Sequence, residues 1–386
     1  MLTLLSIAAA SAWTACQVDA EALRRSVVSF GDTARLQRVL RKARSGGKVV
    51  VGVIGGSITQ GALASAEEKR WGNLVAQWWR ETFPKATVEF VNAGIGATGS
   101  DIGAHRVQSH LLARQPDFVV AEYAVNDPPT EQAAETLEGI VRQVLSRPNR
   151  PAMMLLFTMN NAGGNAQEFH AKVGRHYGLP MVSFRDAMWP EVHAGRVKWD
   201  DIEADEVHPN DRGHAICARL ITDLLTRVLA TMPADGGLPR IARLPGPIIS
   251  DVFERTAMLG PENLTPERCE GFGTGERHWA FGPVWEADRI GSVLVLPVEG
   301  TTIGIVYHRI MGPMGMAEAS VDGGPPVKLD GWFDQTWGGY DACQFVARGL
   351  KPGKHTLTIR LLDEKAQRSQ GHKFRVVRIL CAGLRK

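Results

Sequence analysis

Five strand-like apolar runs that alternate with helical segments constrain the fold of this chain most strongly. The first run, Lys48–Ile54, is rich in β-branched residues, as is usual for a strand buried on both faces of a sheet. Apolar residues recur at helical spacing in the segments that follow the runs. This alternation predicts a parallel five-stranded sheet with helices on both faces, a three-layer α/β/α domain. The other runs are Thr87–Asn92, Phe118–Tyr123, Met153–Thr158 and Met181–Phe184, and the helical segments are Trp71–Phe83, Ile102–Leu112, Glu131–Leu145, Gln167–Tyr177 and Asp211–Leu229.

The sequence changes character after Met232. Proline and glycine are frequent from 233 to 247, as in a linker. Farther on, short β-like runs are separated by turn sequences such as Asp322-Gly323-Gly324. We therefore expect a leader over 1–20, the α/β domain over 21–232, a linker over 233–247 and an antiparallel β-sandwich over 248–386. The β-like runs are Ser292–Pro297, Thr302–His308, Ala317–Val321, His355–Leu361 and Phe374–Leu380.

The composition is that of an ordinary globular protein and narrows the choice of function. The 386 residues carry a formal net charge of only +3, and no basic tract typical of nucleic-acid binding is apparent. No uninterrupted apolar stretch has the length of a membrane span. The segment Met1–Ala12 is apolar and ends in Ala10-Ser11-Ala12, as a signal peptide does. We expect export to the periplasm or out of the cell, with a lipid anchor at Cys16 as a variant and a cytoplasmic location as the alternative.

The five cysteines are scattered and contain no CxxC pair. No spacing of His, Cys and carboxylate residues indicates a metal site, so we expect catalysis without a metal or other cofactor. Cys217 lies in a helical segment and is expected in the core. Cys269 and Cys343 fall in loop-like stretches and could pair as a disulfide. The sequence does not indicate an oligomeric state.

Three small or polar residues, Ser57, Gly96 and Asn126, follow the ends of the first three predicted strands. In open α/β sheets ligands bind beyond the carboxyl ends of the strands, so these residues should converge on one rim. The two glycines before Ser57 permit a sharp turn and leave space above its hydroxyl. The N–H of Gly96 and the amide of Asn126 could donate to an oxyanion. Each feature also has a purely structural explanation, as a strand-ending turn or a turn cap.

An acidic residue and a histidine lie three positions apart just before the last helical segment, in Asp205-Glu206-Val207-His208. The histidine of a hydrolytic triad needs a partner on one ring nitrogen that fixes its tautomer and orientation. Asp205 could supply that partner from the same turn. The alternative is a capped helix start, because Asn210 directly precedes the helical segment.

These four blocks, in this order and spacing, resemble those of the SGNH hydrolase superfamily, the GDSL-type esterases. The resemblance covers about residues 45–230, and the fold it implies is flavodoxin-like. Two positions depart from the family pattern. Gly56 stands where an aspartate commonly precedes the serine, and Ala124 stands where a glycine is usual. Neither change removes a catalytic group.

The resemblance implies a role for each matching residue. Ser57 is the nucleophile, and His208 is the general base and then the general acid. Asp205 orients His208 and stabilises its charge. The N–H groups of Ser57 and Gly96 form the oxyanion hole together with the side chain of Asn126.

Further residues are candidates for contact with the substrate. Thr59 lies two positions beyond the serine, and Trp332 and Trp337 flank a loop-like stretch of the β-rich region. Exposed aromatic rings can stack on sugars, although tryptophan is more often a core residue. The pattern of this region is similar to that of galactose-binding-like, jelly-roll or carbohydrate-binding sandwiches attached to carbohydrate esterases.

We therefore expect a serine esterase that deacetylates a carbohydrate through an acyl-enzyme. Its partners are then a small ester or an acetylated carbohydrate, and not nucleic acid. The alternatives are a lipase or thioesterase of the same superfamily, an O-acyltransferase that uses the same triad, and a non-catalytic carbohydrate-binding protein.

Overall fold

The computed structural model describes residues 18–233 and 237–385, so most of the expected leader, including Cys16, lies outside the described residues. The chain forms two compact units. The first unit extends to Ser100 and continues from Val107 to Ile249, and the second comprises Asp101–Arg106 and the chain from Ser250 onward. None of the helices in the described ranges combines the length and apolar character that a membrane crossing requires.

The first unit is built on a six-stranded sheet in the order β1-β6-β5-β4-β2-β3. The five strands from β2 to β6 are parallel, which confirms the predicted parallel sheet. The additional strand, β1, pairs antiparallel with β6 at the edge. It was not predicted, because three half-buried residues carry too short a pattern. The bounds are β1 Val27–Ser29, β2 Lys48–Gly55, β3 Thr87–Gly94, β4 Phe118–Glu122, β5 Ala152–Phe157 and β6 Met181–Ser183.

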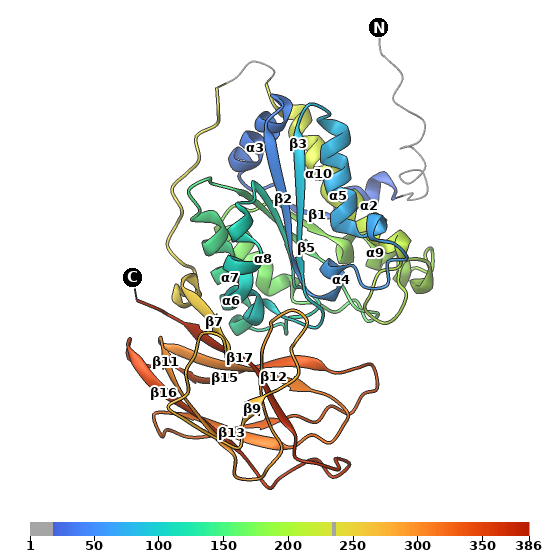
Figure 1. Ribbon diagram of the computed structural model, residues 1–386. Helices are drawn as coiled ribbons and strands as arrows, with labels where there is room; N and C mark the ends of the chain where they lie inside the picture. Colours follow the sequence, from blue (N-terminus) through green and yellow to red (C-terminus); the bar gives the residue numbers. More distant parts are fainter. Residues whose placement is uncertain (1–17, 234–236, 386) are drawn as a thin grey trace. The chain divides into compact units, whose positions relative to one another are not determined.

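Helices cover both faces of this sheet, as the alternation predicts. Figure 1 shows the strands between a layer that contains α5 and α10 and a layer that contains α6, α7 and α8. The predicted helical segments correspond to α5, α6, α7, α8 and α10 within a few residues. The bounds are α2 Ala20–Arg25, α3 Ala34–Arg44, α4 Ser57–Gln60, α5 Trp71–Thr82, α6 Ser100–His110, α7 Glu131–Leu145, α8 Gln167–His176, α9 Phe184–His193 and α10 Asp211–Thr231.

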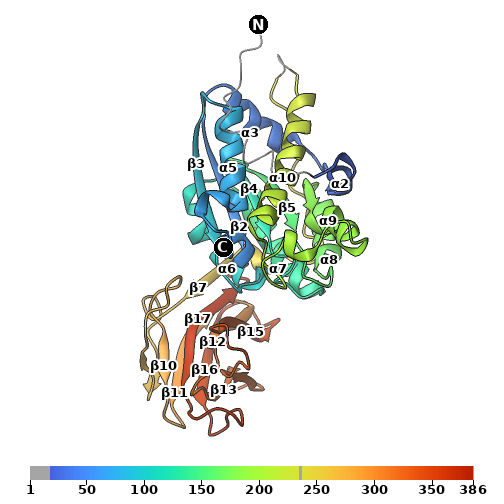
Figure 2. The same cartoon turned by 90° about the vertical axis from the view of Figure 1, so that its right-hand side faces the viewer.

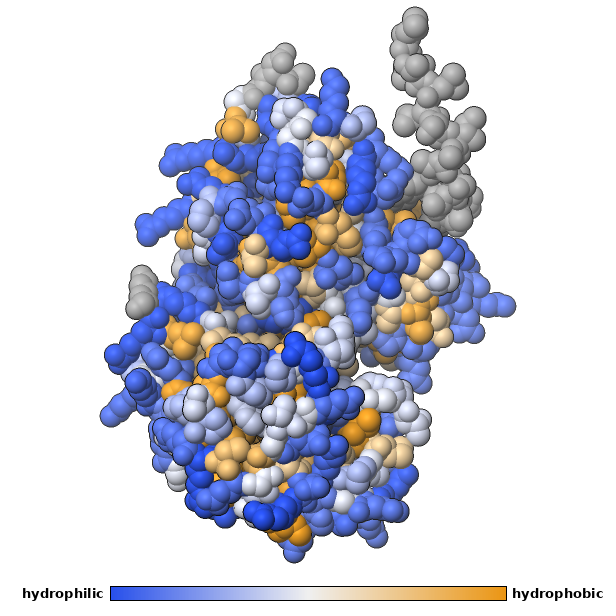
Figure 3. Space-filling view, viewed as in Figure 1, coloured by the Kyte–Doolittle hydropathy of each residue, from blue (hydrophilic) through white to orange (hydrophobic). Residues whose placement is uncertain are grey.

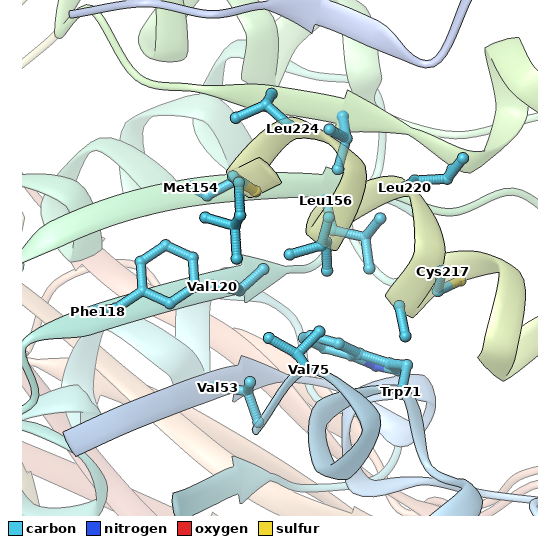
Figure 4. Packing of buried hydrophobic residues seen from close by; sticks show 14 of the residues in the cluster. Val53, Trp71, Val75, Phe118, Val120, Met154, Leu156, Cys217, Leu220 and Leu224 are labelled. Carbon is cyan, nitrogen blue, oxygen red and sulfur yellow. The ribbon is translucent and has the colours of Figure 1, made fainter. Parts of the chain in front are cut away.

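The core of the first unit follows from the strand period of two. Alternate residues of neighbouring strands, such as Val53, Val120 and Leu156, point to one face and meet Trp71 of α5 and Leu220 of α10 (Figure 4). All five of these side chains are at most 1% exposed. Burial of several large apolar side chains, each worth about 1.5–3 kcal/mol, fixes the sheet whose carboxyl edge carries the candidate site.

The strands of the second unit, orange and red in Figure 2, form a sandwich of two antiparallel sheets. One sheet has the order β15-β12-β17-β10-β9, with β7 paired to β17, and the other has the order β14-β13-β16-β11-β8. Apolar residues from both sheets form one core, which includes Leu296, Ile305 and Phe374. The bounds are β7 Thr256–Leu259, β8 Arg268–Glu270, β9 Gly273–Thr274, β10 Trp285–Ala287, β11 Val293–Glu299, β12 Thr302–Arg309, β13 Met316–Val321, β14 Val327–Asp330, β15 Tyr340–Arg348, β16 Lys354–Leu361 and β17 Phe374–Ala382.

The antiparallel sandwich is thus confirmed, and the five predicted runs correspond to β11, β12, β13, β16 and β17. The disulfide that the sequence left open between Cys269 and Cys343 is not formed. Cys269 lies on β8 and Cys343 on β15, which belong to different sheets, and both thiols are free. Cys217 is fully buried in α10, as expected.

Candidate active site

Ser57 opens the short helix α4 immediately beyond the carboxyl end of β2. Gly56 is its N-cap, and Gly61 ends the helix with a φ of 98°, a left-handed conformation that favours glycine. The side chain of Asn92, near the end of β3, donates to the carbonyl of Thr59 at 3.0 Å. The turn that carries Ser57 is therefore tied to the neighbouring strand.

The structure brings Ser57, His208 and Asp205 together in a chain of hydrogen bonds. The Oγ of Ser57 lies 2.8 Å from Nε2 of His208, although the two residues are 151 positions apart. On the other side of the ring, Nδ1 of His208 lies 2.7 Å from Oδ2 of Asp205. If Nδ1 carries the proton, Nε2 is left as an acceptor for the hydroxyl proton of Ser57. This is the arrangement that activates a serine for attack on an acyl group.

The loop that carries Asp205 and His208 is held by its own backbone. Oδ1 of Asp205 accepts from the backbone N–H groups of Val207 and His208, both at 2.7 Å. Partial burial opposes ionisation of Asp205, but the hydrogen bonds from His208 and Val207 outweigh it and hold the pKa of the carboxyl below its usual value. Asn210 caps α10 by accepting from Arg212 and Gly213. The alternative interpretation of this segment as a capped helix start is therefore also true. The segment 205–210 holds both the contact of Asp205 with His208 and the cap of α10.

Asn126 lies beside the residue that precedes the serine. A Cβ built on Gly56 would stand 2.2 Å from Oδ1 of Asn126, so the amide occupies the space that a side chain at 56 would need. Among the described residues, Oδ1 of Asn126 is buried without a partner, and no hydrogen bond engages Nδ2. Nδ2 thus remains free to donate to an acceptor that enters the site.

The loop of Asn126 is anchored through the next residue. Oδ1 of Asp127 accepts from the N–H of Ser100 at 2.7 Å. Oδ2 of Asp127 lies 3.0 Å from Nε2 of His170, and both side chains are almost fully buried. These contacts tie the end of β4 to the start of α6 and to α8, which keeps Asn126 in place.

Gly96 lies at the site, but its N–H is engaged. The N–H donates to Oε1 of Gln60 at 2.8 Å, and a Cβ built on Gly96 would be 3.8 Å from Cβ of Ser57. The N–H of Gly96, a predicted oxyanion donor, is therefore next to Ser57 but already donates to Gln60, a residue that was not predicted to belong to the site. For Gly96 to serve an oxyanion, the amide of Gln60 must move aside.

The side chain of Thr59, a predicted substrate contact, points into the first unit and does not reach the surface. Its side chain is completely buried, and its hydroxyl donates to Oε2 of Glu122 at 3.2 Å. Thr158 donates to the other oxygen of Glu122 at 2.7 Å. Burial raises the pKa of Glu122 to about 7, against the lowering effect of these two hydrogen bonds. Through these two hydrogen bonds, Glu122 connects helix α4, which begins at Ser57, to Thr158 at the end of β5.

A second buried carboxyl, that of Glu203, lies near Asp205. Burial, and then the charge of Asp205, raise the pKa of Glu203 to about 9. Among the described residues, its Oε2 is buried without a hydrogen-bond partner. Glu203 is thus neutral at neutral pH and places no second negative charge beside Asp205. Sequence inspection could not find it, because nothing in the sequence around it indicates burial.

Trp332 and Trp337, the two predicted candidates for sugar contact, lie in the loop between β14 and β15. Trp337 is 59% exposed, and its ring lies 6.1 Å from that of Tyr340 in a stacked arrangement. Trp332 is half-buried, and Arg368 lies over its ring at 5.9 Å. Within the described parts of the chain, no group of three or more His, Cys, Asp or Glu residues is arranged to hold a metal ion.

The chain matches a protein family over part of its length and two solved structures over almost all of it. The model of the GDSL-like lipase/acylhydrolase family matches residues 53–216. Two crystal structures of a two-domain esterase (CEX) active on acetylated mannans, one of them co-crystallised with mannopentaose, match almost throughout. Both are 34% identical with a TM-score of 0.85, and the match covers 94% of this chain and 98% or 99% of the esterase chain. Curated protein sequences give no match.

Proposed function

The chain belongs to the GDSL-like lipase/acylhydrolase family and is a carboxylic ester hydrolase, and from this premise we propose that it removes acetyl groups from a carbohydrate. The observation that carries the proposal is the pair of hydrogen bonds from Ser57 to His208 and from His208 to Asp205. The 34% identical esterase is active on acetylated mannans, so an acetylated mannan is the first substrate to test.

In the proposed mechanism the Oγ of Ser57 attacks the carbonyl carbon of the acetyl group while Nε2 of His208 takes the hydroxyl proton. The carbonyl oxygen becomes an oxyanion, and Asp205 stabilises the imidazolium that forms. When the intermediate collapses, His208 gives its proton to the departing sugar oxygen and leaves acetyl-Ser57. Water then attacks this ester with His208 as base, acetate departs, and the proton returns to Ser57.

The oxyanion hole would consist of Nδ2 of Asn126 and the N–H groups of Ser57 and Gly96. Removing one such donor typically lowers kcat by about 10²–10³, or roughly 3–4 kcal/mol of transition-state stabilisation. The free Nδ2 of Asn126 supports its assignment directly. The contact of Gln60 with Gly96 means that this N–H contributes only after Gln60 has moved.

We further propose that the exposed ring of Trp337 contacts sugar units of a polymeric substrate. Its 59% exposure is unusual for a tryptophan, and the adjacent rings of Phe333 and Tyr340 hold it at the surface. Trp332 is the weaker candidate, since its ring is half-buried and already covered by Arg368.

Acetate release from acetylated mannan, measured for the wild type and for Ser57→Ala, tests the proposal. The wild type should release acetate, and Ser57→Ala should release none above background. A chain-length series of p-nitrophenyl esters extends the test, because a preference for long acyl chains would indicate a lipase or thioesterase. Formation of a new sugar ester when free sugar is added would indicate an acyltransferase, and binding without turnover a non-catalytic protein.

A further inference from the structure

Helix α3 has one apolar face and one basic face. Its apolar face is used, because Leu36, Val39 and Leu40 are buried in the core of the first unit. The helix contains no acidic residue. With the apolar face already packed, the helix is not free to insert into a lipid layer, and what it presents outward is positive charge. The basic residues are Arg35, Arg38, Arg41, Lys42 and Arg44.

Two hollows of the first unit adjoin this basic face. One, of about 680 Å³, lies between α3, the turn at Asn149 and Arg150, and Leu238. The other, of about 550 Å³, is lined by Arg35, the turn around Arg150 and residues 240–244. Among the described residues, nine arginine and lysine side chains line the two hollows, with a single carboxylate. For a chain with a net charge of only +3, this is a strong local concentration of cations; the surface over α3, at the upper left of Figure 3, is mostly hydrophilic.

The one carboxylate does not neutralise the site. Oδ1 of Asp117 accepts from Nζ of Lys42 at 2.7 Å, and its Oδ2 accepts from the N–H of Val50 at 2.9 Å. The guanidinium of Arg38 reaches only a backbone carbonyl, that of Pro239, at 3.4 Å. Among the described residues, no ion pair joins a carboxylate to Arg38, Arg44, Arg147, Arg150, Arg240 or Arg243.

The cations also act on one another. Burial, and then the charge of Arg150, lower the pKa of Arg35, while Asp32 offsets part of this effect. Like charges held in a concave surface raise the local potential and attract anions. A bound anion would relieve this repulsion, and arginine forks match the paired oxygens of a phosphate group.

We propose that these two hollows form a binding site for a phosphate-bearing anion. Cations from α3, from the turn at 147–150 and from residues 240–243 line the second hollow, and Arg150 lines both hollows, so several phosphate oxygens can be contacted at once. The site lies at the amino end of the sheet, where Arg150 precedes β5. Ser57 follows the carboxyl end of β2, a strand of eight residues, which places the two sites about 25 Å apart. Binding there would hold the enzyme on phosphate-bearing material and leave the catalytic rim open.

Pyrophosphate is the probe for this site, and calorimetric titration at low ionic strength measures its binding to the full chain. Arg38→Glu combined with Arg150→Glu should weaken binding at least tenfold. The matched control is Arg80→Glu with Arg175→Glu, which changes the net charge equally at two exposed arginines of the same unit outside the hollows. The control should keep its affinity within about twofold, and acetate release should be unaffected by pyrophosphate in all three proteins.

Sedimentation with vesicles separates the sources of the phosphate. Binding to phosphatidylglycerol vesicles, but not to phosphatidylcholine vesicles, by the wild type and not by the Arg38/Arg150 variant would assign a lipid headgroup. Pyrophosphate binding without vesicle binding would assign a soluble phosphate. The proposal is overturned if the wild type binds neither probe saturably, or if both double variants lose binding equally. The binding measurements do not require ester hydrolysis, so their outcomes are independent of the proposed function.

Discussion

Replacement of Gly56 by alanine tests how the oxyanion side of the site is built. The new Cβ would lie 2.2 Å from Oδ1 and 2.9 Å from Nδ2 of Asn126, closer than any non-bonded contact allows. The φ of Gly56, −84°, lies outside the left-handed region, so the backbone does not require glycine. The methyl group would displace the amide of Asn126, because this amide is the end of a side chain that can rotate away.

The expected loss is therefore catalytic and not structural. Displacing one oxyanion donor should lower kcat by about 10²–10³, while the unfolding temperature should stay close to that of the wild type. Asn126→Ala should give a similar loss. Because both changes remove the same donor, the double variant should be no slower than Asn126→Ala alone, a large departure from additivity.

Initial rates of acetate release from an acetylated oligosaccharide give the four values of this cycle. Gly246→Ala is the control, since a Cβ there would have nothing within 4 Å. A Gly56→Ala variant with the kcat of the wild type would refute the reasoning. So would a double variant whose loss equals the product of the two single losses, because Gly56 would then act independently of Asn126.

Three further predictions concern the residues at and around Ser57, His208 and Asp205. Asp205→Asn should lower kcat by about 10⁴ with little change in KM, because the histidine tautomer is no longer fixed; a loss confined to KM would contradict the assigned role. Gln60→Glu should place a carboxylate against the N–H of Gly96, so its kcat should fall relative to Gln60→Ala as the pH rises above about 4.3, and identical pH profiles would exclude Gly96 as a donor. The pKa of Glu122 is raised from 4.5 to about 7, so the folded protein keeps a proton that the unfolded chain has released. Stability should therefore fall by about 3 kcal/mol as the pH rises from 4.5 to 7. Glu122→Gln should remove that part of the pH dependence in urea unfolding, and an unchanged dependence would contradict the burial argument.

The parallel sheet and the positions of Ser57 and Asn126 follow from the sequence for a simple reason. A buried parallel strand has a strong local pattern, and its carboxyl end identifies the rim where such residues meet. Asp205 could be placed because its partner is only three positions away. Strand β1 could not, because its three residues gain their structure from pairing with β6.

Other features depend on contacts between distant segments and leave no local pattern. Thr59 points into the unit and not to the rim because α4 turns its side chain toward Glu122. The contact between Gln60 and Gly96 joins residues 36 positions apart. The basic hollows are lined by residues of α3, of the turn at 147–150 and of the segment 240–243. Because these segments are far apart in the sequence, the low net charge of the chain gives no indication of this concentration of positive charge.

Labelling with a fluorophosphonate, followed by peptide mapping, tests the central claim most directly. The reagent modifies only a serine that a neighbouring base has activated. One equivalent should attach to Ser57 and abolish acetate release, and His208→Ala should prevent both the labelling and the turnover. Labelling of another residue at full loss of activity, or turnover that survives complete labelling of Ser57, would contradict the assignment of Ser57 as the nucleophile.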